Sequence, residues 1–196
     1  MATPSRAASF IVGLATLASL GATPPARAQA PTFGLGRAPT IEEIRAIDIG
    51  VTPDGQGLPP GSGTAEAGKK VFESRCVTCH GATAKEGPQD VLVGGQGTLN
   101  TGKPIKTVGS YWPYATTLWD YVNRAMPFDH PRTLPPNDVY SATAYLLYLN
   151  GIVGEHDVLD QTTLPRVRMP NRGGFVIDTR PDTGTKPRPA TRRRER

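Results

Sequence analysis

The sequence predicts an all-α domain of three to five helices, flanked by long irregular arms at both ends. Apolar residues recur at steps of three and four along several stretches, which is the period of an α-helix. Strand-like alternation is almost absent. Glycine (22) and proline (20) make up 42 of 196 residues, about 21%, against about 12% in average proteins. This excess favours loops and arms around a modest core.

The first 28 residues are typical of an export signal. Arg6 gives a positive start, residues 7–22 are apolar and uncharged, and ARAQA offers small residues for cleavage. We expect cleavage after Ala28. A retained membrane anchor is the alternative, but the run is short for a spanning helix.

The basic character lies in the C-terminal tail. The last eleven residues hold Lys186 and five arginines against Glu195, a charge of +5. Subtracting this +5 and the two arginines of residues 1–28 from the formal +5 leaves about −2 for residues 29–185. We expect 181–196 to be a disordered solubilising tail, with docking to an acidic partner or anionic membrane as the alternative. Nucleic-acid binding would need basic residues on the folded body.

A short helix is expected within an N-terminal arm, residues 29–63. Thr40 and Glu43 have the spacing of a capping box, and isoleucines at 41, 44 and 47 share one face. Residues 48–63 are rich in turn-forming residues and should form a loop.

Three longer helices are expected in a central domain, residues 64–152. Their ranges are 64–76, 115–125 and 137–150. Pro127 stops the second and Gly151 closes the third. The last helix is apolar on most sides, so it should be buried. Residues 153–180 form an extended arm that should wrap the core or lie along a partner.

The only two cysteines, Cys76 and Cys79, are followed directly by His80. C-x-x-C-H is the attachment site of c-type haem. Two thiols one helical turn apart reach the two vinyl groups of a porphyrin, and the next residue then lies under the iron. The motif therefore predicts one covalent haem with His80 as proximal ligand.

Other uses of this motif fit less well. A thioredoxin-like redox pair would need a βαβ context, but here a helix precedes and a loop follows. A zinc site would need four ligands, and neither His130 nor His156 has ligand-like neighbours. A disulfide across so short a loop would stabilise the fold little.

The sixth iron ligand is expected to be Met126. It lies just past a helix end in a stiff Ala–Met–Pro turn, fifty residues after Cys76 (126 − 76). A methionine ligand raises the reduction potential and suits electron transfer. Met169, which we place as a contact of the arm, and His130 in a surface loop are the rival ligands.

The chain resembles the class I cytochromes c. The resemblance rests on CVTCHG, on Met126 with its proline, and on Gly68 and Phe72, which match the family's small–aromatic pair. In the family this pair crosses an aromatic residue of the last helix, here Tyr145. The loop EGP resembles the family's Gly–Pro loop and implies that the carbonyl of Pro88 accepts a hydrogen bond from the proximal histidine.

A narrower resemblance covers roughly residues 35–177. Stretches such as LGRAPTIEEIRAIDIGVTPDG, TVGSYWPYATTLWDYVNRAMPFDHP and AYLLYLNGIV are similar to the cytochrome subunits of bacterial periplasmic sulfite and sulfane dehydrogenases. The resemblance implies a periplasmic, electron-accepting partner of a molybdenum-cofactor dehydrogenase subunit. It also implies a downstream cytochrome or oxidase. Some members have a second haem domain, whereas this chain has one C-x-x-C-H.

On this interpretation the chain is an electron carrier without catalytic residues. The alternatives are a free-standing carrier, a haem enzyme or gas sensor with a labile distal ligand, and a non-redox binding module. An apolar haem pocket is expected from the last helix together with Leu99, Ile105, Leu118 and Val122. The aromatics of SYWPY, residues 110–114, are expected either to pack in the core or to hydrogen bond a haem propionate.

Overall fold

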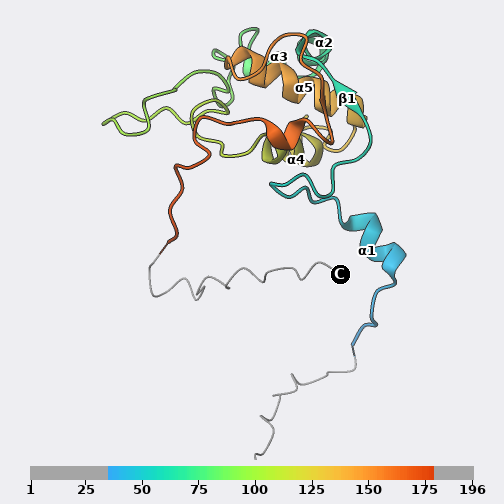
Figure 1. Cartoon of the computed structure of the whole chain (residues 1–196). Coiled ribbons are helices and arrows are strands. Elements are labelled where there is room, and N and C mark those ends of the chain that lie inside the picture. Colours follow the sequence, from blue (N-terminus) through green and yellow to red (C-terminus); the bar gives the residue numbers. More distant parts are fainter. Residues whose placement is uncertain (1–34, 179–196) are drawn as a thin grey trace, which may run out of the picture. The chain divides into compact units, whose positions relative to one another are not determined.

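The computed structural model describes residues 35–178. The chain divides into a unit that ends at Pro39 and a second that begins at Thr40. The predicted signal peptide and the basic tail lie outside the described residues. The described helices all belong to the second unit, so the fold below is that of this unit (Figure 1).

Helix α1 (Ile41–Ile47) has the predicted capping box. The Thr40 side chain accepts from the Glu43 backbone N–H at 3.2 Å, and the Glu43 carboxylate accepts from the Thr40 N–H at 2.8 Å. These two bonds satisfy donors that a helix start leaves unpaired. No residue of α1 is buried.

Three further helices fall where they were predicted, within one residue: α2 (Ala65–Arg75), α4 (Ala115–Ala125) and α5 (Pro136–Leu149). The one-turn helix α3 (Val77–His80) was not predicted. Helix α2 is capped by Thr64, which accepts from the Ala67 N–H at 3.3 Å. Helices α2 and α4 both pack against α5. As predicted, α5 is buried over most of its length.

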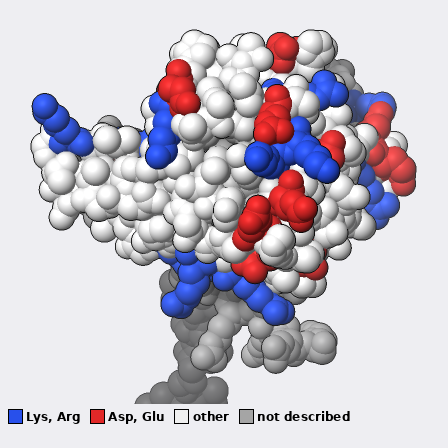
Figure 2. Space-filling model, turned by 90° about the horizontal axis from the view of Figure 1, so that it is seen from above, with Lys and Arg blue, Asp and Glu red and all other residues white. Residues whose placement is uncertain are grey.

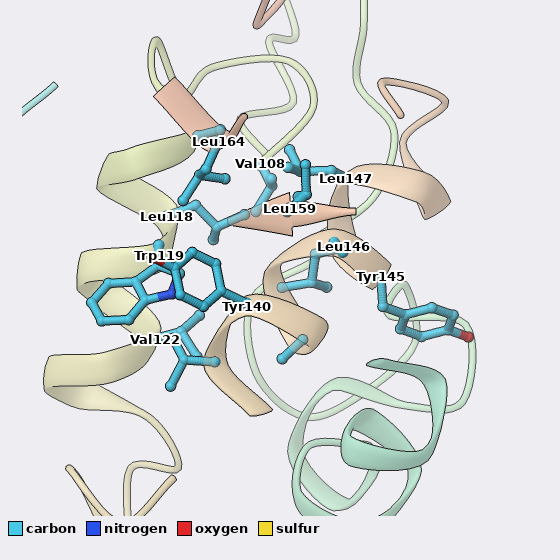
Figure 3. Packing of buried hydrophobic residues seen from close by; sticks show 14 of the residues in the cluster. Val108, Leu118, Trp119, Val122, Tyr140, Tyr145, Leu146, Leu147, Leu159 and Leu164 are labelled. Atoms are coloured by element: carbon cyan, nitrogen blue, oxygen red, sulfur yellow. The ribbon is translucent and has the colours of Figure 1, made fainter. Parts of the chain in front are cut away.

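The core is built around α5, between α2, α4 and the C-terminal arm, and part of it is drawn in Figure 3. The Trp119 and Tyr140 rings meet with centroids 5.4 Å apart, and Leu118 and Val122 pack beside them on α4. Leu146 extends this layer along α5. The long loop between α3 and α4 runs out to one side of these helices (Figure 1).

The predicted crossing of the first and last helices of the core is present. A Cβ placed on Gly68 would lie 1.9 Å from the Ser141 carbonyl oxygen and 2.8 Å from the Tyr145 Cβ. Only glycine permits this approach of the two backbones. The Phe72 and Tyr145 rings fill the space beside it, with centroids 5.4 Å apart and planes tilted by 55°.

The C-terminal arm lies against the core. Strand β2 (Leu159–Asp160) pairs antiparallel with β1 (Ser62–Gly63). A 3₁₀ turn, η1 (Leu164–Arg166), follows. Leu159, Leu164 and Met169 are buried in the main cluster. The arm therefore closes one side of the core.

Residues 51–59 of the N-terminal arm are held by hydrogen bonds between their backbone and side chains of α4 and α5. The Val51 N–H donates to the Asp120 carboxylate at 3.0 Å. Thr116 donates to the Pro53 carbonyl at 3.2 Å, and Tyr140 donates to the Pro59 carbonyl at 3.0 Å. These bonds hold residues 51–59 along α4 and α5.

Tyr140 makes the stability of the fold depend on pH in the alkaline range. Burial, with a smaller contribution from Asp160, raises the pKa of its phenol to about 12, against about 10 in an unfolded chain. The stabilisation is fully present below pH 10 and is lost as pH rises towards 12. Between pH 10 and pH 12, the free energy of unfolding of the Tyr140→Phe variant should fall by on the order of 1 kcal/mol less than that of the parent protein. Urea unfolding at the two pH values measures this difference. Tyr121→Phe, at a half-exposed ring, is the matched control, and an unchanged decline in Tyr140→Phe would contradict the assignment.

Candidate functional site

The Cys76–His80 segment forms a tight helical turn at the junction of α2 and α3. Cys76 ends α2, with its N–H donating to the Phe72 carbonyl at 2.8 Å. The Cys76 carbonyl then accepts from the N–H groups of Cys79 at 3.1 Å and His80 at 2.9 Å. Gly81, at φ +74°, ends the turn. The backbone therefore presents both thiols and the imidazole within one turn.

Both thiols are free. Cys76 is half-buried and packs against the core, whereas Cys79 is exposed. Burial, and secondarily the neighbouring Cys79, raises the pKa of the Cys76 thiol to about 11. The disulfide alternative is thus absent from this structure, and both sulfurs are available for thioether bonds.

The His80 ring is held by one backbone acceptor. Its Nδ1 lies 3.1 Å from the Asp90 carbonyl oxygen. A carbonyl oxygen only accepts, so Nδ1 carries the proton in this bond and Nε2 keeps its lone pair. Such a bond fixes the ring of a metal-ligating histidine and raises its basicity.

The prediction that Pro88 accepts this bond is wrong, since the acceptor is Asp90, two residues further on. Gly87 packs so closely on the turn that a Cβ there would lie 2.1 Å from the Cys79 carbonyl oxygen. The Gln89 N–H then donates to that same carbonyl at 3.0 Å. With the loop fixed at Gln89, the Asp90 carbonyl reaches the ring, and Pro88 lies exposed.

The candidate sixth ligands differ in setting. Met126 is the C-cap of α4, with its N–H donating to the Val122 carbonyl at 3.1 Å, and its half-buried side chain packs against the core. Met169 is 3% exposed in the arm. His130 is an exposed residue paired with exposed Asp129. The structure therefore leaves the two methionines as core-packed candidates.

The predicted pocket residues divide between core and surface. Leu118 and Val122 are buried and Leu99 is half-buried. Ile105 is 50% exposed. It lies at the surface because Thr98 folds the loop back, accepting from the Ile105 N–H at 3.0 Å and donating to the Gly95 carbonyl at 2.6 Å.

Two neighbouring grooves of about 470 and 310 Å³ lie beside this loop. They share Leu99, Asn100 and Asn171 in their linings. The Asn171 amide donates to the Tyr111 carbonyl at 2.7 Å. The arm and the loop therefore meet at this place, which sequence spacing does not indicate.

The SYWPY aromatics all make ring contacts. Tyr111 meets Phe175 edge to face at 5.2 Å, and Trp112 meets Tyr121 at 5.5 Å. The Arg172 guanidinium lies 5.1 Å from the centre of the Tyr114 ring. These contacts favour the packing interpretation of the segment.

Asn150 is a positioning residue that the sequence analysis missed. Its amide donates to the Leu92 carbonyl at 3.2 Å and the Leu146 carbonyl at 2.8 Å, while its oxygen accepts from the Gly94 N–H at 3.0 Å. It thereby ties the loop after the haem motif to the end of α5. In the sequence alone, an asparagine before the closing glycine of a helix indicates only where the helix ends.

The metal and redox-pair alternatives receive no support in residues 35–178. No group of three or more His, Cys, Asp or Glu side chains is arranged there to hold a metal ion. The two described strands have two residues each, so no βαβ unit surrounds the cysteines. The free thiols and the oriented imidazole fit covalent haem attachment.

Comparisons with known proteins agree with this chemistry. The family model described as cytochrome c oxidase, cbb3-type, subunit III matches residues 63–146, which include the C-x-x-C-H turn and Met126. A chain in the crystal structure of the sulfane dehydrogenase SoxCD from Paracoccus pantotrophus is 45% identical, with a TM-score of 0.70 over 82% of each chain. No curated protein matches the chain significantly.

Proposed function

The chain belongs to the class I cytochromes c, and from this premise we propose that it binds one haem and accepts electrons from a periplasmic molybdenum-cofactor dehydrogenase subunit. The observation behind the haem proposal is the turn that presents two free thiols and an imidazole whose Nδ1 is occupied. A haem of this kind takes up and releases one electron at a time.

The residues of the turn have separate roles in this proposal. Cys76 and Cys79 form the thioether bonds, and His80 offers Nε2 to the iron. The Asp90 carbonyl fixes the ring through Nδ1. Asn150 and the close-packed Gly87 keep the following loop against this side of the motif.

We propose Met126 as the sixth ligand. Replacing it by leucine, which keeps volume and removes sulfur, should abolish the methionine–iron absorption band of the oxidised protein. The reduction potential should fall, since a methionine ligand raises it. Met169→Leu is the matched control and should keep the band. If Met169→Leu lost the band and Met126→Leu kept it, the ligand would be Met169 of the C-terminal arm instead.

Support for the partner comes from the likeness to a chain of the sulfane dehydrogenase SoxCD. At 45% identity over 82% of both chains, the likeness extends beyond the haem domain into the arms. We propose sulfite or a sulfane as the source of the electrons. The catalytic chemistry would belong to the partner, and this chain would supply the acceptor.

Stopped-flow reduction tests this function. The holoprotein is mixed with its purified dehydrogenase subunit and sulfite, thiosulfate or a protein-bound sulfane, and haem reduction is followed by absorbance. We expect rapid reduction that requires both subunit and substrate. A protein that is reduced by dithionite but not by the dehydrogenase subunit with any of these substrates would favour a free-standing carrier. Rapid carbon monoxide binding by the reduced protein would favour a haem enzyme or sensor.

We propose that the mature protein begins at Gln29 in the periplasm. In the described part of the chain, no helix is long and apolar enough to cross a membrane. Intact mass under denaturing conditions tests cleavage and cofactor together. The expected mass is that of residues 29–196 plus one haem, and a mass that includes residues 1–28 would contradict export with cleavage.

A further inference from the structure

Helix α1 exposes an apolar face that nothing in the described chain covers. Ile41, Ile44 and Ile47 share one side of the helix and are 53%, 41% and 78% exposed. No residue of α1 is buried. Isolated exposed apolar residues are common, but three isoleucines in register on one short helix form a defined docking face.

The sequence specifies this helix although none of its residues is buried by the described part of the chain. A complete capping box starts it, Glu42 and Glu43 lie in the first turn, and Arg45 lies in the last. These features suit the helix dipole. A seven-residue helix is nonetheless too short to be stable alone. Its capping box and charges favour the helical conformation and so lower the entropy cost of ordering it on binding. Packing against a partner would supply the remaining stability.

Pairing with a second copy of the chain would bury too little surface. At the observed exposures the three isoleucines offer roughly 300 Å² per copy, so a pair would bury roughly 600 Å². Stable interfaces bury about 1,200 Å² or more. The α1 face therefore suits one part of a larger interface with a different protein.

The likeness to the SoxCD chain indicates which protein this is. The match covers 82% of 196 residues, about 160 residues, which leaves about 35 outside it. An unbroken span of this length includes residues 41–47 wherever it begins. The matching chain was crystallised in the sulfane dehydrogenase SoxCD. We propose that α1 is a docking helix whose Ile41, Ile44 and Ile47 enter an apolar groove of the molybdenum-cofactor dehydrogenase subunit, which rests on the proposed function.

The charge distribution fits an apolar contact. Helix α1 itself carries both signs of charge, with Glu42 and Glu43 in its first turn and Arg45 in its last. The face of the protein seen in Figure 2, on which α1 is not visible, likewise mixes acidic and basic side chains with uncharged areas. An interface based on α1 would depend on apolar burial and therefore little on ionic strength. Affinity measured at low and high salt should accordingly be similar.

The test is binding of a triple variant, Ile41→Gln, Ile44→Gln and Ile47→Gln, to the purified dehydrogenase subunit. Glutamine is a good helix former, so the helix is kept and its apolar face is lost. We expect at least a tenfold increase in Kd by calorimetry. The thermal midpoint and haem spectrum of the isolated holoprotein should not change. The matched control replaces Glu42 and Arg45 by glutamine and should bind like wild type.

Four results would overturn the inference. Unchanged affinity of the triple variant, with wild type binding and being reduced normally, would overturn it and leave the proposed function standing. A lower thermal midpoint of the isolated variant would show that the face packs on its own core. A wild-type dimer that the variant dissociates would assign the face to a second copy. Failure of the wild-type protein to bind would overturn the proposed function as well.

Discussion

Replacing Cys76 and Cys79 together by serine is expected to abolish covalent haem attachment. Serine keeps the size of the side chain but cannot form a thioether with a vinyl group. The variant, exported from a host competent in cytochrome c maturation, should therefore lack the haem increment in its denatured mass. It should also lose the absorption spectrum that survives denaturation in the parent protein.

The matched control for this experiment is Ser74→Ala, two residues before the motif. The Ser74 hydroxyl donates only to the Val71 carbonyl, at 3.1 Å on an exposed face of α2. This variant should carry the full haem increment. Haem that remains attached in the double serine variant would show that the thiols are not the attachment points, and a wild-type protein without haem would remove the electron-carrier proposal.

Gly68→Ala is expected to destabilise the fold severely. A methyl group at this position would lie 1.9 Å from the Ser141 carbonyl oxygen and 2.8 Å from the Tyr145 Cβ. Neither neighbour can yield, because one is the backbone of α5 and the other is the base of a packed ring. The two helices must separate, which we expect to cost about 3 kcal/mol or more. Chemical unfolding of the holoprotein followed by far-ultraviolet circular dichroism measures this loss.

Gly102→Ala provides the comparison. No atom lies within 4 Å of a Cβ at Gly102, which is in the exposed loop between α3 and α4. Its free energy of unfolding should stay within about 0.5 kcal/mol of the parent, as for most surface changes. Equal stability of the two variants would mean that α2 and α5 do not cross as closely as the structure shows.

Local sequence determined the elements and the chemistry of the motif. The bounds of α1, α2, α4 and α5 were predicted within one residue because caps, prolines and apolar periodicity act over only a few positions. The same holds for Cys76, Cys79 and His80, whose spacing alone places them on one turn. The Gly68–Tyr145 crossing is a long-range contact, and it was predicted only through the family resemblance.

Contacts between distant segments required the tertiary structure. Asp90 rather than Pro88 holds the His80 ring because the path of the loop is fixed by Gly87 and Gln89 against the Cys79 carbonyl. Moving the accepting carbonyl by two residues along a loop does not alter the local conformational propensities that a sequence reveals. Which carbonyl accepts depends on which backbone groups find partners in the packed turn.

The arms show the same division. Their proline and glycine content indicated irregular backbone, but it did not indicate that Met169 and Leu164 would be buried or that Asn150 would tie the motif loop to α5. Composition governs how a segment can bend, since that is a property of each residue. Burial depends on the surfaces that the rest of the chain presents, so only the folded structure decided which arm residues became core.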